Sequence, residues 1–200
     1  DHMARVHNIE ISNVKITNAD PRYPILLMGL VDSRIENVIM KNITVEFRGG
    51  ITMQQAVEQR QLNTNWRFTQ YGTKPSVQTL PWLVNTFFLK EEGLLPRADW
   101  DPKAECWKDD PYNVPELPHV YPEPSNWGIL PAYGMYARHV DGLLMENVEF
   151  TWKTEDGRHA VVLDDAYGVK LKNIRADVKD GVEPAAAVTS HFRRPTNHEY

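Results

Sequence analysis

The chain has 200 residues, of which 42% are hydrophobic, with 14 prolines, 11 glycines and a formal net charge of −5. The negative charge and the lack of a basic stripe argue against a nucleic-acid partner. The single cysteine, Cys106, excludes a framework of internal disulfides. No apolar run is long enough to cross a membrane as a helix, so no membrane partner is expected.

The length predicts one domain. Residues 1–3 are expected to be a cloning remnant, and residues 4–200 a single domain. Its sections are residues 5–50, which hold the first repeats, residues 51–132, which break the repeat and form an insertion, and residues 133–191, where the repeats resume.

One pattern occurs twice in the first section. In residues 6–16 and again in residues 35–45, apolar and polar positions alternate on both sides of an asparagine, Asn13 or Asn42. At the asparagine the alternation slips by one residue. Alternation with period two predicts strands rather than helices, and an apolar segment at residues 23–30 predicts a further strand.

The insertion differs from the repeats in composition. It contains ten of the 14 prolines and five of the six tryptophans. Because a structureless loop of this length is unusual in a compact domain, we expect an excursion packed against the side of the repeats.

The same pattern returns twice after the insertion, in residues 140–150 and 166–176, with Asn147 and Asn173 at the equivalent position. Apolar strands are expected before both copies, and residues 185–189 would open a further repeat.

The asparagines predict the architecture. Asparagine tolerates the left-handed backbone of a sharp corner, and stacked asparagine side chains can form a hydrogen-bonded ladder. The spacings of 29 residues (Asn13 to Asn42) and 26 residues (Asn147 to Asn173) suit one turn of three short strands. The sequence therefore predicts an all-β fold, a parallel β-solenoid of about four to five coils. The alternative is that the asparagines mark unrelated turns.

A family resemblance adds to this prediction. The stretch from Tyr121 to Val140, followed by His159 to Asp165, resembles the C-terminal coils of bacterial polygalacturonase-like glycoside hydrolases, which are pectin-degrading right-handed parallel β-helix proteins. The resemblance is weak only in residues 51–115. It implies a right-handed helix, a polysaccharide or oligosaccharide partner, and a secreted or periplasmic location.

The family's catalytic motifs are largely missing from this chain. Asn-Thr-Asp, Gly-His-Gly and Arg-Ile-Lys do not occur, and the Asp-Asp pair within the resembling stretch, Asp164-Asp165, follows Val-Val-Leu rather than a glycine. One prediction is a glycoside hydrolase acting on pectic or other uronic-acid-containing plant cell-wall polysaccharide, an activity expected of the parent protein. The alternative is a non-catalytic polysaccharide-binding or structural fragment of such an enzyme.

The candidate catalytic residues are Asp164, Asp165 and His139. Glycoside hydrolysis uses two carboxylates, and a histidine transfers protons near neutral pH. Arg138 is expected to bind a sugar carboxylate. The alternatives are a turn capped by the aspartates and an arginine that serves only a structural ion pair.

Further substrate-binding residues are predicted around the motif: Trp127, Tyr121, Glu123 and Tyr133. Aromatic rings stack on the apolar faces of sugars, although the same rings could simply pack the insertion onto the domain. The histidine, cysteine and acidic residues show no metal-ligand spacing, so neither a metal nor a cofactor is expected.

Self-association is also expected. Neither end of the repeats carries a recognisable capping segment, and uncapped repeats expose apolar surface and unpaired backbone. We therefore expect a homo-oligomer formed through the uncapped ends or through the insertion.

Overall fold

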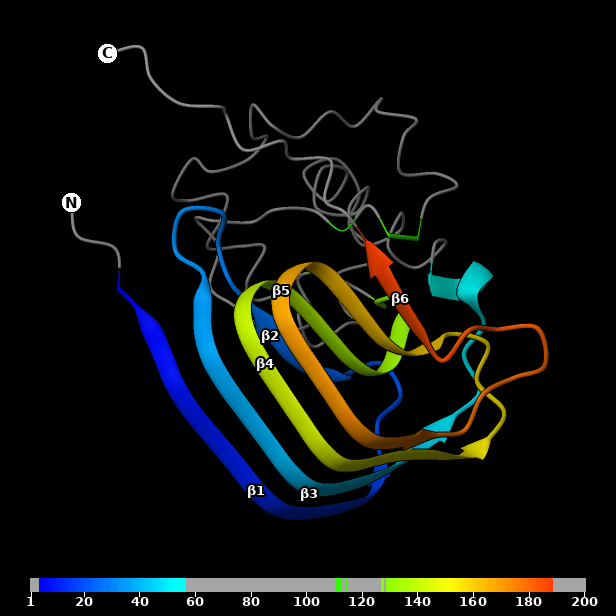
Figure 1. The fold of residues 1–200 in the computed structure, drawn as a ribbon. Coiled ribbons are helices and arrows are strands. Elements are labelled where there is room, and N and C mark those ends of the chain that lie inside the picture. The colour runs from blue at the N-terminus through cyan, green and yellow to red at the C-terminus, as the bar shows by residue number, and fades with distance from the viewer. Residues whose placement is uncertain (1–3, 57–110, 113, 115–126, 128, 189–200) are drawn as a thin grey trace, which may run out of the picture.

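The computed structural model describes residues 4–56, 111–112, 114, 127 and 129–188 and shows an all-β arrangement (Figure 1). The sheet has the order β1-β3-β4-β5-β6, β2 pairs with β4, and every pairing between these strands is parallel. A single helical turn covers residues 53–56. The strands are β1 (Val6–Ala19), β2 (Ile25–Met28), β3 (Ile35–Gly49), β4 (Ala132–Thr154), β5 (His159–Ala176) and β6 (Ala185–Val188).

The four copies of the sequence pattern lie side by side in register. Val14 pairs with Ile43, Ile43 with Val148, and Val148 with Ile174. Long stretches of sequence separate these strands, yet equivalent positions face each other along their length. The expected stacking of the copies is confirmed.

The asparagines form the expected ladder at one bend of the strands. All four have φ between 50° and 58°. The Nδ2 of Asn42 donates to the Oδ1 of Asn13 at 3.0 Å, and the same bond recurs from Asn147 to Asn42 at 3.1 Å and from Asn173 to Asn147 at 2.8 Å. The predicted left-handed corner is therefore confirmed at each copy.

A second bend precedes the first by five residues and was not predicted. It stacks Asn8, Asn37, Gly142 and Gly168, all with positive φ. A Cβ on Gly142 would lie 3.1 Å from the Asn37 Oδ1, so glycine also fits the close approach of the neighbouring strand.

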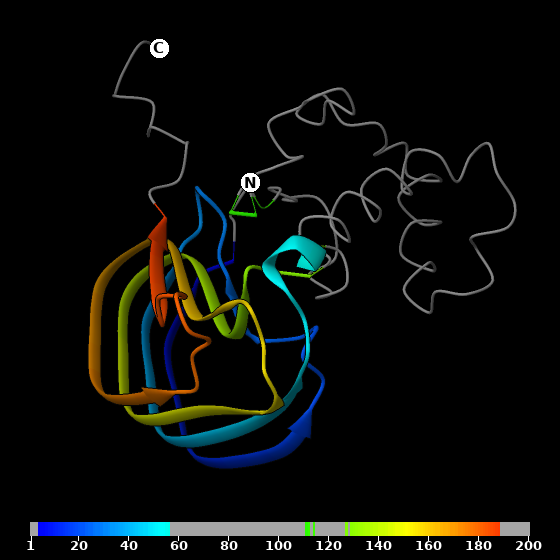
Figure 2. The same cartoon turned by 90° about the vertical axis from the view of Figure 1, so that its right-hand side faces the viewer.

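The strands curve around an apolar core (Figure 2). Because the backbone reverses its alternation at each asparagine, the apolar residues before and after the corner both face inward. In β3 these are Val38 and Met40, then Ile43 and Val45, and each is 1% exposed. The equivalent residues of β4 are Leu143, Met145, Val148 and Phe150.

A second, smaller core covers the outer face of the sheet. Val114, Trp127 and Leu130, from the end of the insertion, pack on Tyr136 of β4 and Val162 of β5. The beginning of β4 is consequently buried on both faces. The expectation that the insertion packs against the side of the repeats is confirmed for these residues, while residues 57–110 lie outside the described part of the chain.

A buried ion pair holds the two ends of the insertion together. Arg158 Nε donates to Asp156 Oδ1 at 2.9 Å, and neither side chain is exposed. The backbone amide of Ile51, where the chain leaves β3, donates to Asp156. Arg158 also donates to the carbonyl oxygens of Leu130, on the returning chain, and of Pro21, on the turn before β2.

Asn42→Ala should destabilise the protein by about 2 kcal/mol, because it removes two ladder bonds and forces alanine into a left-handed backbone. Asn42→Gly loses the same bonds without the backbone strain, so it should recover about 1 kcal/mol of that loss. Urea unfolding at a constant m-value measures both, with Lys41→Ala on the same strand as the control. Equal stability of all four proteins would contradict a structural role for the ladder.

Candidate functional site

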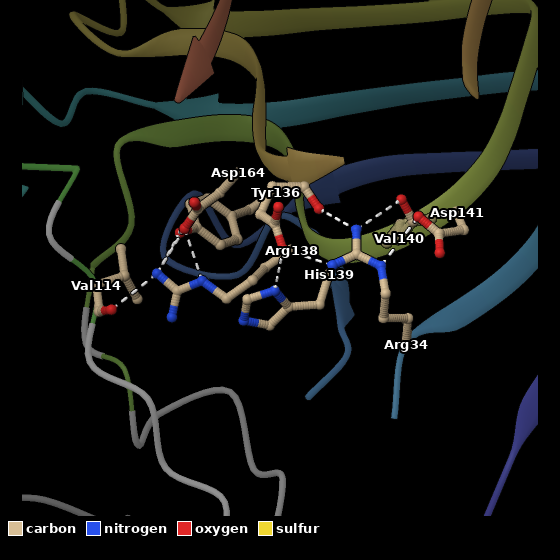
Figure 3. A network of polar contacts seen from close by, with 9 residues as sticks. Arg34, Val114, Tyr136, Arg138, His139, Val140, Asp141 and Asp164 are labelled. Carbon is tan, nitrogen blue, oxygen red and sulfur yellow. Dashed lines mark hydrogen bonds and ion pairs between the residues drawn. The ribbon is translucent and has the colours of Figure 1, made fainter. Parts of the chain in front are cut away.

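Asp164 lies on the outer face of β5 in a buried polar network (Figure 3). Its Oδ2 accepts hydrogen bonds from Tyr136 Oη and Arg138 Nε, each at 2.6 Å. Arg138 Nη2 also donates to the Val114 carbonyl oxygen at 2.7 Å. The second core covers this network, since Arg138 and Asp164 are only 3% and 2% exposed.

Asp165 occupies a different position, at a bend that follows the buried stretch of β5. It has φ of 51° and stacks on His139, which has φ of 50°. His139 Nδ1 donates to Asp165 Oδ2 at 2.6 Å, and Arg34 Nη1 donates to the same oxygen at 2.5 Å. Arg34 also forms an ion pair with the half-exposed Asp141 at 2.9 Å.

The surroundings of Asp165 keep it ionised. Burial by itself raises the pKa of this carboxyl, but the hydrogen bonds from Arg34 and His139 outweigh burial and hold the pKa below its ordinary value. Burial lowers the pKa of Arg34, but the hydrogen bonds and charges of Asp165 and Asp141 together outweigh it and raise this pKa above its ordinary value.

This arrangement separates the two predicted catalytic carboxylates. Asp164 points into the covered face and bonds Arg138, whereas Asp165 turns at the bend and bonds Arg34 and His139. A general acid must hold a proton to donate, and a general base must have a free oxygen to accept one. An ionised Asp165 has no proton to donate as a general acid, and its Oδ2 already accepts bonds from Arg34 and His139. Asp164 is shielded from solvent.

The predicted sugar-stacking residues are placed as follows. Tyr133 lies inside the main core with no exposure, and its hydroxyl donates to the carbonyl oxygens of Phe150 and Asp177. Burial raises the pKa of Tyr133. Trp127 belongs to the second core and is 4% exposed. The rings of these two residues pack the domain, which corrects their assignment to a sugar-binding surface.

Two further predicted residues, Tyr121 and Glu123, lie outside the described residues. Arg138 is predicted to hold a substrate carboxylate. In the structure it forms an ion pair with Asp164 instead. His139 is fully buried, and its Nδ1 donates to Asp165, another of the predicted catalytic residues.

A cluster that the sequence analysis missed lies on the surface at the turn between β1 and β2. Asp20 accepts hydrogen bonds from Arg22 (Nε 3.0 Å, Nη2 2.8 Å) and from Arg48 Nη2 at 2.6 Å, and Arg22 lies over the ring of Tyr23 at 5.2 Å. We call these four residues the Asp20 cluster. Lys153, opposite Arg48 on β4, adds a third half-exposed cation.

The local sequence explains only part of the Asp20 cluster. Asp20 caps its own turn, since its carboxylate accepts from the Arg22 amide at 3.0 Å. An Asp-Pro-Arg turn is recognisable in the sequence, but Arg48 joins it only through the pairing of β1 with β3.

A buried histidine was also missed. His159 Nδ1 donates to the Glu183 carbonyl oxygen, so its Nε2 accepts the hydrogen bond from Tyr112 Oη; both contacts measure 2.6 Å. This histidine fastens residue 112 of the insertion to β5 and to the loop before β6.

Among the described residues, no group of three or more histidine, cysteine, aspartate or glutamate side chains is arranged to hold a metal ion. Helices long and apolar enough to cross a membrane are likewise absent from the described part of the chain. No protein-family model, curated protein or solved structure matches this sequence.

Arg138→Met should destabilise the protein by about 3 to 5 kcal/mol, because it leaves the Asp164 carboxylate buried without its cation. The double variant Arg138→Met/Asp164→Leu should be clearly more stable than Arg138→Met alone. Chemical denaturation measures both, and Arg5→Met, which breaks an exposed pair with Glu36, should cost at most about 1 kcal/mol. A single-variant cost no larger than that of Arg5→Met would contradict the buried pair.

Asp20 should contribute to the pH dependence of stability. The hydrogen bond from Arg22 is the main reason that its pKa falls from 3.8 to about 2. A carboxyl with a depressed folded-state pKa contributes stability that is present above its unfolded pKa and is lost as pH falls through its folded pKa. Asp20→Asn should therefore reduce stability at pH 6 by up to about 1 kcal/mol, and the difference should vanish between pH about 4 and 2.

Urea midpoints from pH 6 to pH 2 test this expectation, with Asp180→Asn as an exposed control that changes the charge equally. A deficit of Asp20→Asn that stays constant over that range would show that Asp20 acts through something other than its charge.

Proposed function

We propose that the stacked sheet is part of a right-handed parallel β-helix in which each copy of the pattern is one coil. Parallel pairing in a constant register, an asparagine ladder at one bend, and the further pairing of β2, β4, β5 and β6 along another side support this assignment. Parallel strands in one sheet are joined with a right-handed crossover in nearly all proteins, which supports the handedness.

Within that fold, we propose non-catalytic binding of a pectic or other uronic-acid-containing polysaccharide as the function of this segment. The observation that carries this choice over hydrolysis is that Asp164 and Asp165 are each neutralised by an arginine and face different surroundings. Such polysaccharides occur outside cells, and a secreted or periplasmic location belongs to the same proposal.

The Asp20 cluster is the binding surface that we assign. Arginine pairs bidentately with carboxylates, the acidic group of a uronic sugar, and a tyrosine ring offers a face for the sugar's C–H groups. The side chains of Arg22 and Arg48 are 44% and 50% exposed, so both remain accessible while they share Asp20. Three cations against Asp20 and Glu46 leave this surface positive on an acidic protein.

Hydrolysis of the same polysaccharide is the second candidate. It rests on the family resemblance and on Asp164, a carboxylate within hydrogen-bonding distance of Tyr136 and Arg138. This activity would require the covering residues of the insertion, including Val114 and Trp127, to move away from Asp164.

Retardation of the protein in gels that contain homogalacturonan should test binding. Arg22→Ala and Arg48→Ala should each weaken the retardation about fivefold, the equivalent of an exposed charge contact of about 1 kcal/mol. Arg5→Ala removes an equally exposed cation elsewhere and should leave the retardation unchanged. Added salt should weaken binding because it screens exposed charges.

The same samples should release no reducing sugar from pectin, homogalacturonan or cellulose. Release that disappears in Asp164→Asn would support the second candidate. An equal loss of retardation in Arg5→Ala and Arg48→Ala would remove the Asp20 cluster as the binding surface, and no retardation of the wild type would leave a structural role.

A further inference from the structure

The exposed large apolar side chains of the described residues all lie on two strands. They are Val6, Ile11 and Ile16 on β1, which are 47%, 37% and 42% exposed, and Tyr167 and Leu171 on β5, which are 53% and 42% exposed. Figure 1 places β1 and β5 on opposite sides of β3 and β4. At the pattern position of Ile11 and Leu171, the inner strands carry Met40 and Met145, which are buried.

Both strands also have a free edge in the described part of the chain. Among the described strands, β1 pairs only with β3, and β6 pairs with residues 161–164 of β5, so no described strand pairs with residues 168–176 of β5 on that side. Free strand edges expose unpaired backbone groups and readily add another strand.

The two edges complement each other at the asparagine ladder. Each ladder bond runs from the Nδ2 of one copy to the Oδ1 of the preceding copy. At the ends, this direction leaves the Asn13 Nδ2 as a donor and the Asn173 Oδ1 as an acceptor. A β1 strand placed beside β5 in the register of the other pairs would join these two groups in one more ladder bond.

One pair of oppositely charged side chains would meet in this register. Glu10 would face Lys170 on the outer surface, because both occupy the pattern position held by Ile39 and Leu144 in the inner strands. Arg5 would lie opposite Asp165, but the Asp165 carboxylate already pairs with Arg34 and His139. Lys15 and Arg175 would face each other with like charge, so the contact is not optimised at every position.

We propose that copies of this chain stack head to tail, with residues 6–16 of one copy pairing in parallel with residues 166–176 of the next. Ile11 would then bury against Leu171, as Met40 packs beside Met145 within the chain. The edge next to residues 161–164 is already occupied by β6, and the incoming strand begins just beyond it. This inference does not depend on polysaccharide binding.

Head-to-tail contacts use two different surfaces and do not close on themselves unless the copies form a ring. The expected product is therefore a series of species whose average mass rises with concentration above the 23.1 kDa of one chain. A contact between two β1 edges or two β5 edges would instead be symmetric and would stop at a dimer.

Analytical ultracentrifugation over a range of concentrations should test the proposal. Glu10→Lys and Lys170→Glu should each raise the concentration needed for assembly about fivefold, since each places like charges at the contact. Lys41→Glu changes the net charge as Lys170→Glu does, but on β3, which has neighbours on both sides. It should assemble like the wild type.

A mixture of Glu10→Lys with Lys170→Glu provides the decisive test. In an alternating stack, the two substituted side chains would face each other with opposite charges at one contact, and the native Glu10 and Lys170 would face each other at the next. The mixture should therefore assemble at the wild-type concentration. Circular dichroism of each variant checks that the fold is retained. A monomer at all concentrations, a closed dimer, or a mixture no better than either variant alone would overturn the proposal.

Discussion

The left-handed asparagine corner is the constraint on which the rest of the sheet depends. A strand that continued straight past Asn42 would turn Ile43 and Val45 outward, because side chains alternate across a strand. The positive φ at Asn42 reverses that alternation and keeps both residues in the core. Once every copy bends at the same residue, parallel pairing in register and a shared core follow, and the side-chain amides stack at the bend.

The outer face of the sheet is also buried, but it carries charged side chains. Residues 114, 127 and 130 bury it, and charged groups that lose their water must be paired. Arg138 therefore meets Asp164, and Arg158 meets Asp156. These pairs fix where the insertion leaves and rejoins the repeats. The same burial removes from solvent Asp164, one of the two predicted catalytic carboxylates, and for this reason we propose binding rather than hydrolysis for this segment.

The exposed side chains that remain available for binding therefore lie outside the core, at a turn and on the two outermost strands. The turn before β2 gathers two half-exposed arginines around one aspartate. The outermost strands expose Ile11 and Leu171 at the pattern position where the inner strands bury Met40 and Met145. Both features arise because equivalent positions differ in burial between the inner strands, the bends and the outermost strands, although the sequence pattern is the same in each strand.

The sequence by itself determined the all-β character, the four pattern copies and the asparagine corner, since period-two alternation and left-handed tolerance are local properties. It could also have placed Tyr133 in the core, because Tyr133 shares the inward parity of Met135. The tertiary structure alone decided the pairing of Arg34 with Asp165 and of Arg48 with Asp20. These partners are far apart in the chain, and only the register of stacked strands and the burial of a face bring them together.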